Sequence, residues 1–271
     1  MSIKTHAITC STMELAFLAG LLGADSLIGV PDPFVGWSAE AVDQAWAEAR
    51  QTLAQRRLVA LGPDGSISIE ETVAELVGTC GFAEATFMLT YTSADGTVAG
   101  HHFHVIRQSA VELVLSHDTV LTCLLRPLDT EAVLDRVAEI FRLEGQNGPA
   151  VPNARLTERS LRAARQLAEE SGVAAAEEHL LGAGLSPEVS AALAATLARP
   201  LGNGALVAMP NDQSSHSVDG LALLEGESGL WLLRNVHERG TRWVDVVPCS
   251  AASMLAFIRS IMNRALPGKL V

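Results

Sequence analysis

The sequence predicts an α+β fold built on one unit that occurs twice, in residues 85–141 and in residues 205–262. Each copy contains four short apolar, β-branched runs separated by turn residues, and then one amphipathic helical stretch. The fourth run of each copy ends at a proline, Pro127 or Pro248, which can close a hydrogen-bonded ladder but cannot continue it. We therefore expect a duplicated antiparallel meander plus helix, in which the two meanders pair across a pseudo-twofold axis into one central sheet with flanking helical bundles.

Turn chemistry sets the bounds of the expected strands. In the first copy the turn Ser93-Ala94-Asp95-Gly96 separates the first two runs, and Asp129 is placed to cap the helix; in the second copy Ser250 has that place. The expected strands are residues 86–91, 100–106, 110–116 and 119–127 in the first copy, and residues 205–210, 218–226, 229–236 and 241–248 in the second.

Helical segments precede each meander. Before the first, apolar spacing predicts helices over residues 12–23, 39–59 and 70–78, with Trp46 on the core face of the second helix and a small hairpin over residues 58–61 and 66–69. Before the second, it predicts helices over residues 156–172, 173–184 and 187–198. The cluster Gly145–Pro149 between the copies is interpreted as a surface linker. We expect one domain, residues 1–271, made of two pseudo-repeats of about 10–148 and 153–271.

Composition bounds the class of protein. The chain has 271 residues, of which 48% are hydrophobic, which is enough for a real core. No apolar run reaches the roughly 18 residues of a membrane span, and the start lacks the pattern of a signal peptide, so we expect a soluble cytoplasmic protein without a membrane partner. The four cysteines lie far apart without a C-x-x-C pair, and we expect them to be reduced and at least partly buried.

Nucleic acid is not expected as a partner. The net charge of −12 would repel a phosphate backbone. Arg50, Arg56 and Arg57 close the second helix next to a hairpin, as in a winged-helix fragment, but basic side chains at a helix C-terminus also complement the helix dipole. Glu70 and Glu71, just beyond the hairpin, favour that second interpretation.

Candidate chemistry is sparse, and we expect no cofactor and no bound metal. His101, His102 and His104 form the densest cluster of candidate ligands, but no acidic or thiol partner has a recognisable spacing. We interpret them as the polar face of an exposed strand, with a metal site as the alternative. Gly202-Asn203-Gly204 is interpreted as a helix stop. Ser214, Ser215 and His216 lie in a polar loop where nothing holds a base within reach of a nucleophile.

The order of elements and several short motifs resemble the EspG family, the chaperones associated with type VII (ESX) secretion. The matching segments are a first helix running into Leu22-Gly23, a helix end over residues 53–58, Asp64-Gly65 in a hairpin and a helix over residues 69–77. The last strand into Val247-Pro248 and the terminal helix over residues 250–265 match as well. Leu58 stands where the family usually has a glycine. The likeness spans nearly the whole chain.

The resemblance implies a non-enzymatic chaperone or adaptor that binds PE–PPE heterodimers in the cytosol before export. It also implies a contact surface formed by the loops of the sheet and the C-terminal helices. In this sequence the loop spans residues 92–98, and its candidate binding residues are Thr92, Ser93, Asp95, Thr97 and Val98. The loop at residues 211–217 occupies the equivalent place in the second copy. Two alternatives stay open: a ligand- or protein-binding module of the same fold without a secretion role, and a hydrolase or metal enzyme that uses the histidine cluster.

Overall fold

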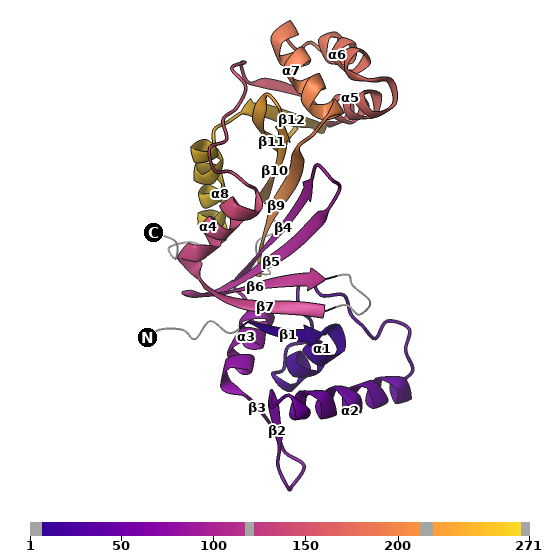
Figure 1. Cartoon of the computed structure of the whole chain (residues 1–271), viewed down its shortest axis with the longest axis vertical. Coiled ribbons are helices and arrows are strands. Elements are labelled where there is room, and N and C mark those ends of the chain that lie inside the picture. The colour runs from indigo at the N-terminus through magenta and orange to yellow at the C-terminus, as the bar shows by residue number, and fades with distance from the viewer. Residues whose placement is uncertain (1–6, 117–121, 212–218, 267–271) are drawn as a thin grey trace.

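A computed structural model describes residues 7–116, 122–211 and 219–266 of the chain. Within these residues a ten-stranded antiparallel sheet forms the middle of the molecule, and helices lie beyond both of its ends (Figure 1). In the order of the sheet the strands are β1 (Ile8–Ser11), β7 (Thr122–Asp129), β6 (Ser109–Ser116), β5 (Val98–Ile106), β4 (Ala85–Ser93), β9 (Gly202–Pro210), β10 (Asp219–Gly226), β11 (Gly229–Glu238), β12 (Thr241–Pro248) and β8 (Ala154–Thr157). The expected α+β class and the single central sheet are confirmed.

The two expected meanders are the two halves of this sheet. Strands β4 to β7 are followed by α4 (Thr130–Ile140), and strands β9 to β12 are followed by α8 (Ala251–Ala265). The halves join where β4 pairs with β9, with Leu89 opposite Leu206. The first strand of each half, β4 or β9, lies at this junction, and the two pair antiparallel. From there the strands follow in chain order toward both ends of the sheet, β4 to β7 on one side and β9 to β12 on the other. The pseudo-twofold relation between the two halves stays a prediction.

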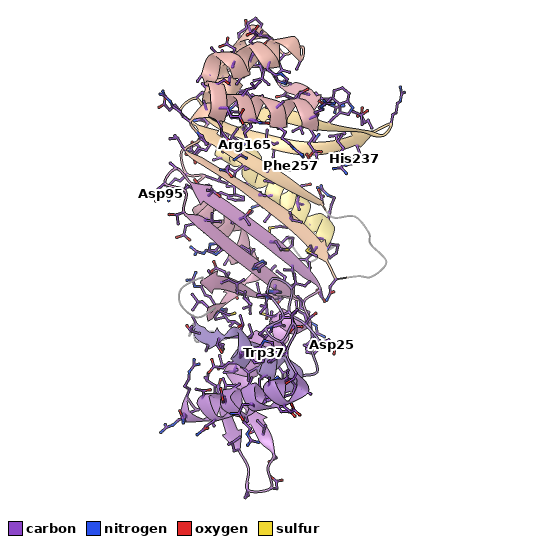
Figure 2. All side chains as sticks on the ribbon, turned by 90° about the vertical axis from the view of Figure 1, so that its right-hand side faces the viewer. Asp25, Trp37, Asp95, Arg165, His237 and Phe257 are labelled. Carbon is purple, nitrogen blue, oxygen red and sulfur yellow. The ribbon has the colours of Figure 1, made fainter. Side chains whose placement is uncertain are left out.

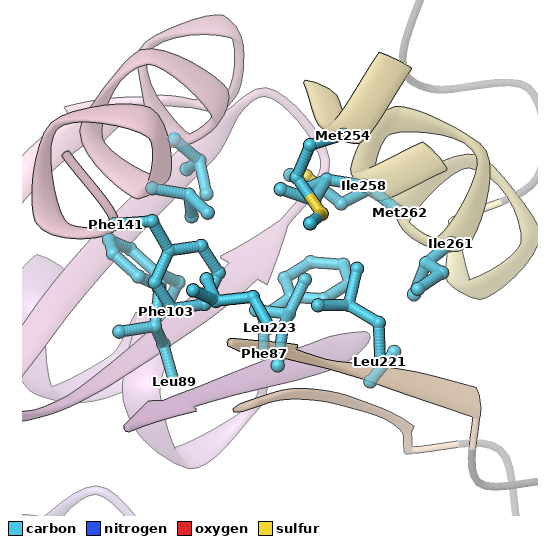
Figure 3. Close-up of a cluster of buried hydrophobic side chains, with 14 of the residues drawn as sticks. Phe87, Leu89, Phe103, Phe141, Leu221, Leu223, Met254, Ile258, Ile261 and Met262 are labelled. Carbon is cyan, nitrogen blue, oxygen red and sulfur yellow. The ribbon is translucent and has the colours of Figure 1, made fainter. Parts of the chain in front are cut away.

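Helices α4 and α8 cover one face of the sheet and close the main core (Figure 3). Phe87 and Phe103 from the first half, Leu221 and Leu223 from the second, and Ile258 from α8 are buried together there. Full burial of each such side chain stabilises the fold by about 1.5–3 kcal/mol. One continuous core therefore ties the two halves together.

Two helical groups cover the other face, one at each end of the sheet (Figure 1). The N-terminal group packs over β6 and β7, and the C-terminal group packs over β10 to β12. The N-terminal group consists of α1 (Thr12–Leu21), α2 (Ala39–Gln55), α3 (Glu71–Gly81) and the hairpin β2 (Val59–Leu61) with β3 (Ile67–Ile69). The C-terminal group consists of α5 (Glu158–Ser171), α6 (Val173–Gly182) and α7 (Pro187–Ala198).

Capping residues start most of these helices where the sequence predicts. Ser11 forms a capping box with Glu14, and Ser38, Ser186 and Ser250 each accept a hydrogen bond from a backbone N–H in the first turn. Asp129 occupies the N-cap of α4 but makes no side-chain capping hydrogen bond.

Several local predictions were wrong. β7 continues through Pro127 to Asp129, because β1 pairs only with residues 122–125 and leaves the outer side of β7 without a partner at Pro127 in the described chain. Gly202 to Gly204 begin β9 instead of ending a helix. Helix α2 ends at Gln55 and not at Val59, and Arg57, two residues after its end, takes a positive φ of 60°. Trp46 is 40% exposed and not part of the core.

The expected surface linker is fixed to the second half of the sheet. The carbonyl oxygen of Asn147 accepts a hydrogen bond from the backbone N–H of Leu230, and that of Gln146 accepts one from Ala251, both at 2.9 Å. A Cβ atom at Gly148 would overlap the backbone of Cys249. The segment is therefore a packed connection between the halves, not a free tether.

The four cysteines are free and buried, as expected. Burial raises the pKa of each thiol, to about 12 for Cys10 and about 11 for Cys123. Among the described helices none combines the length and apolar character needed to cross a membrane.

Candidate binding groove

The centre of the sheet is the part of its second face that neither helical group covers. Side chains of β4 and β9 point there in register, with Thr90 opposite Ala205 and Thr92 opposite Asn203. Ala222 of β10 lies beside Ala205 in the same row. Figure 2 looks onto this face, where no helix covers the central strands between the two helical groups. Small side chains in a row leave the sheet surface low, so a partner's side chains can approach the backbone.

A groove of about 580 Å³ lies between this strip and the C-terminal helices. Its floor is formed by Thr90, Ala205 and Ala222, and its wall by Leu161 of α5 and Leu197 of α7. Leu197 is buried, while Thr90 is exposed and Leu161 is half-buried. The groove thus has an apolar wall and a floor of short side chains, which suits the insertion of apolar anchors from a partner.

Charged side chains form the outer rim of the groove. Arg162 and Arg165 project from α5 and pair with Glu158 and Glu169 one turn away, at 2.5 and 3.0 Å. Arg165 is labelled at the lower edge of the helices in Figure 2. Exposed pairs of this kind contribute little to stability, so the guanidinium groups can exchange partners with a bound ligand at small cost.

The loop that the sequence singles out lies next to this groove. The structure places Thr92 and Ser93 at the end of β4, beside Asn203 and Gly202, and Asn203 lines the groove. Val98 starts β5 opposite Thr92 and is 67% exposed. Asp95 marks the tip of the turn in Figure 2. The turn and the groove therefore form one continuous surface.

Asp95 holds the turn in a fixed shape. Its Oδ1 accepts hydrogen bonds from the Ser93 hydroxyl at 2.6 Å and from the Thr97 backbone N–H at 3.0 Å. These hydrogen bonds, that from Ser93 first, lower the pKa of Asp95 to about 2. Gly96 takes a positive φ of 81°, which glycine adopts without strain. The turn is a preformed feature at the edge of the groove.

Beneath the strip, a buried polar contact joins the two halves. The hydroxyl of Tyr91 donates to Glu225 at 3.1 Å, and the side-chain amide of Gln146 donates to the other carboxylate oxygen at 2.7 Å. Burial, and then the charge of Glu225, raise the pKa of Tyr91 to about 12. A Cβ at position 202 would overlap the Tyr91 hydroxyl, which explains the glycine that begins β9.

The histidine cluster is buried, so its interpretation as the face of an exposed strand was wrong. His101, His102 and His104 are 7%, 9% and 0% exposed, because α4 and α8 cover one face of β5 and the N-terminal group covers the other. His101 bonds to Glu112 at 2.7 Å, a partner that sequence spacing did not reveal, since it lies on the next strand.

The three histidines do not converge on one site. The side chain of His101 lies on the sheet face that α4 covers. On that face Glu112 also accepts hydrogen bonds from Arg126 and Arg136. His104 contacts the Thr86 hydroxyl through Nδ1 at 3.2 Å on the opposite face. Across the described ranges, no group of three or more His, Cys, Asp or Glu side chains could hold a metal ion.

The second loop of interest falls outside the described residues. The described residues leave out most of the loop at 211–217, including Ser214, Ser215 and His216. Since β4 and β9 are antiparallel, the chain leaves β9 at Pro210 beside Ala85, at the far end of β4 from the 92–98 turn.

The turn could be predicted from the sequence, but the groove beside it could not. The groove depends on the pairing of β4 with β9, which joins residues more than one hundred positions apart, and on the place of α5 and α7 over β10 to β12. A partial signal was present in the short side chains Thr90, Ala205 and Ala222, each of which has a large apolar neighbour in its strand.

Comparison with known proteins supports the fold. No family model matches the sequence, and no curated protein matches it either. Among solved structures, the type VII secretion system chaperone EspG5 of Mycobacterium tuberculosis, solved in complex with a PE25–PPE41 dimer, superposes with a TM-score of 0.67. The match covers 97% of this chain and 98% of that chain at 14% identity. HtdX from the same organism aligns with a TM-score of only 0.16, which carries no argument. The expected resemblance is thus confirmed as a weak one in sequence, and the chain has the fold of an EspG-like chaperone.

Proposed function

We propose that this protein is a non-enzymatic binding protein that holds a protein client in the cytosol, as a chaperone or adaptor of the EspG type. The observation that carries the proposal is a fold shared with EspG5 over nearly all of both chains, together with an open groove on its central sheet. The solved EspG5 structure contains a PE25–PPE41 dimer, so a PE–PPE-like heterodimer is the proposed class of client.

The proposed contact surface is the groove together with the turn that carries Thr92, Ser93, Asp95, Thr97 and Val98. Apolar anchors of the client would lie over Ala205 and Ala222 against Leu197, while Val98 and the polar side chains of the turn contact its rim. Buried apolar contacts surrounded by a polar rim are typical of specific protein interfaces.

A ligand-binding module of the same fold without a secretion role is the second candidate. A volume of about 580 Å³ also lies in the range of small-molecule sites. The two candidates differ in the class of ligand, and direct binding experiments separate them.

The test is co-expression of the tagged protein with PE–PPE pairs of its source organism, followed by size-exclusion chromatography and affinity measurement. Thr90→Tyr fills the groove at an exposed strand position, where tyrosine keeps β-propensity. We expect it to weaken client binding by about tenfold or more. The matched control is Ser68→Tyr, at an exposed strand position in the β2–β3 hairpin, and it should bind like the wild type.

The turn is tested by a pair of variants at Asp95. Asp95→Asn keeps the oxygen that accepts the Ser93 and Thr97 hydrogen bonds but removes the charge, whereas Asp95→Arg removes both. If neither variant alters binding, the turn is not part of the surface. If no PE–PPE pair binds the wild-type protein, the second candidate replaces the first.

A further inference from the structure

A second concave surface lies at the other end of the molecule, on the N-terminal helices. Phe17, Phe34, Trp37 and Trp46, here called the outer aromatic cluster, contact one another edge-on or tilted, with ring centroids 5.8–6.3 Å apart. Trp37 is 47% exposed and Trp46 is 40% exposed, and the neighbouring Val35 is 78% exposed. Large apolar side chains gathered at the surface commonly mark an interaction site.

Trp46 and Phe34 form one wall of a pocket of about 400 Å³. The floor is made by small residues of α1 and the turn after it, Ala16, Gly20 and Ala24 among them. A Cβ at Gly20 would meet the Trp46 ring at 3.6 Å, an ordinary contact distance, so the glycine is not needed for packing there. The small floor leaves room in the pocket beside the Trp46 ring.

Asp25 and Asp32 line the same pocket. Asp32 uses Oδ1 to accept the Phe34 backbone N–H at 2.9 Å, and no ion pair involves Asp25 or Asp32 in the part of the chain that the structure describes. Residues 12–57 contain six acidic and three basic residues, and one of the basic residues, Arg56, pairs with Glu14 at 3.0 Å. The pocket therefore combines an aromatic wall, an apolar floor and an unneutralised negative rim.

We infer that this pocket binds an arginine side chain from an exposed segment of a partner protein. An arginine has an apolar stem for the floor and a planar cation that stacks on an indole and pairs with carboxylates. A lysine fits less well, because its strongly hydrated ammonium group does not stack. The site lies at the opposite end of the sheet from the groove and does not depend on the proposed function (Figures 1 and 2).

The test uses full-length protein labelled with ¹⁵N at tryptophan and the blocked peptide acetyl-Leu-Arg-Leu-amide. The chain has four tryptophans, so the indole N–H signals of Trp37 and Trp46 can be separated from the other two by single substitutions. We expect saturable shifts at Trp46 and Trp37. Trp231, which is fully buried and donates to Thr196 in the C-terminal half, should not move.

Three matched comparisons make the result specific. A peptide with citrulline in place of arginine keeps the shape but not the charge and should not saturate. The double variant Asp25→Asn/Asp32→Asn, which keeps the oxygen that accepts the Phe34 N–H, should weaken binding by about fivefold. Gly20→Leu should fill the pocket and abolish the shifts. Equal binding of the citrulline peptide, unchanged affinity of the aspartate double variant, or absence of any saturable shift would each overturn the inference.

Discussion

Acidification from pH about 7.5 to about 5 is expected to destabilise this protein through a buried histidine at the junction of sheet and N-terminal helices. His104 is 0% exposed, and burial, together with the nearby His102, lowers its pKa from 6.5 to about 3. The unfolded chain therefore takes up a proton first as the pH falls. The stability that neutral His104 provides is complete above pH 6.5 and is lost progressively between pH 6.5 and about 3.

The magnitude follows from the two pKa values. At pH about 5, some 1.5 units below the unfolded value, His104 alone accounts for a loss of about 2 kcal/mol in the free energy of unfolding. His102, whose pKa burial also lowers, adds to the loss in the same direction. The carboxylates with lowered pKa values titrate below their ordinary value of 4.5 or 3.8, so they contribute little in this window.

Urea unfolding at both pH values measures the effect. In His104→Gln the difference between the two pH values should shrink by about 2 kcal/mol, although the variant is less stable at both. The matched control is His237→Gln, since His237 is exposed, and its pH profile should follow the wild type. If His104→Gln and the wild type lose equal stability on acidification, His104 is not the source of the acid sensitivity.

Two further predictions concern the core and the domain organisation. Glu112→Gln leaves Arg126 and Arg136 without their buried carboxylate. It should lower the free energy of unfolding by about 3 kcal/mol in urea titrations at neutral pH. A loss within error of zero would show that this ionic network is dispensable. Because β4 pairs with β9 over one shared core, we propose that the chain is a single domain that unfolds in one calorimetric transition. Two separate transitions would mean that the halves are independent domains.

Much of the fold could be predicted from local sequence. Turn residues such as Asp95-Gly96, and capping residues such as Ser186 and Ser250, mark chain reversals and helix starts that depend on neighbouring residues only. The strands β1 and β8 were missed. Each has four residues and is a strand only because a longer strand, β7 or β12, lies beside it. In the same way, Pro127 stays in β7 because of its edge position.

The candidate site was harder to predict because it depends on long-range packing. The alternation in residues 100–106 is compatible with an exposed strand, and only the helices on both faces bury the histidines. Such strands, covered on both sides, carry no solvent-facing pattern of their own. The groove likewise exists only once α5 and α7 pack over β10 to β12 and stop short of β4.

Hydrogen–deuterium exchange on the protein alone and in complex with a PE–PPE dimer tests the proposed binding surface most directly. If the groove and the turn hold the client, amides of residues 90–98 and 197–205 become protected in the complex, while those of the β2–β3 hairpin do not change. A complex that forms without added protection in either segment would show that the groove and the turn do not hold the client.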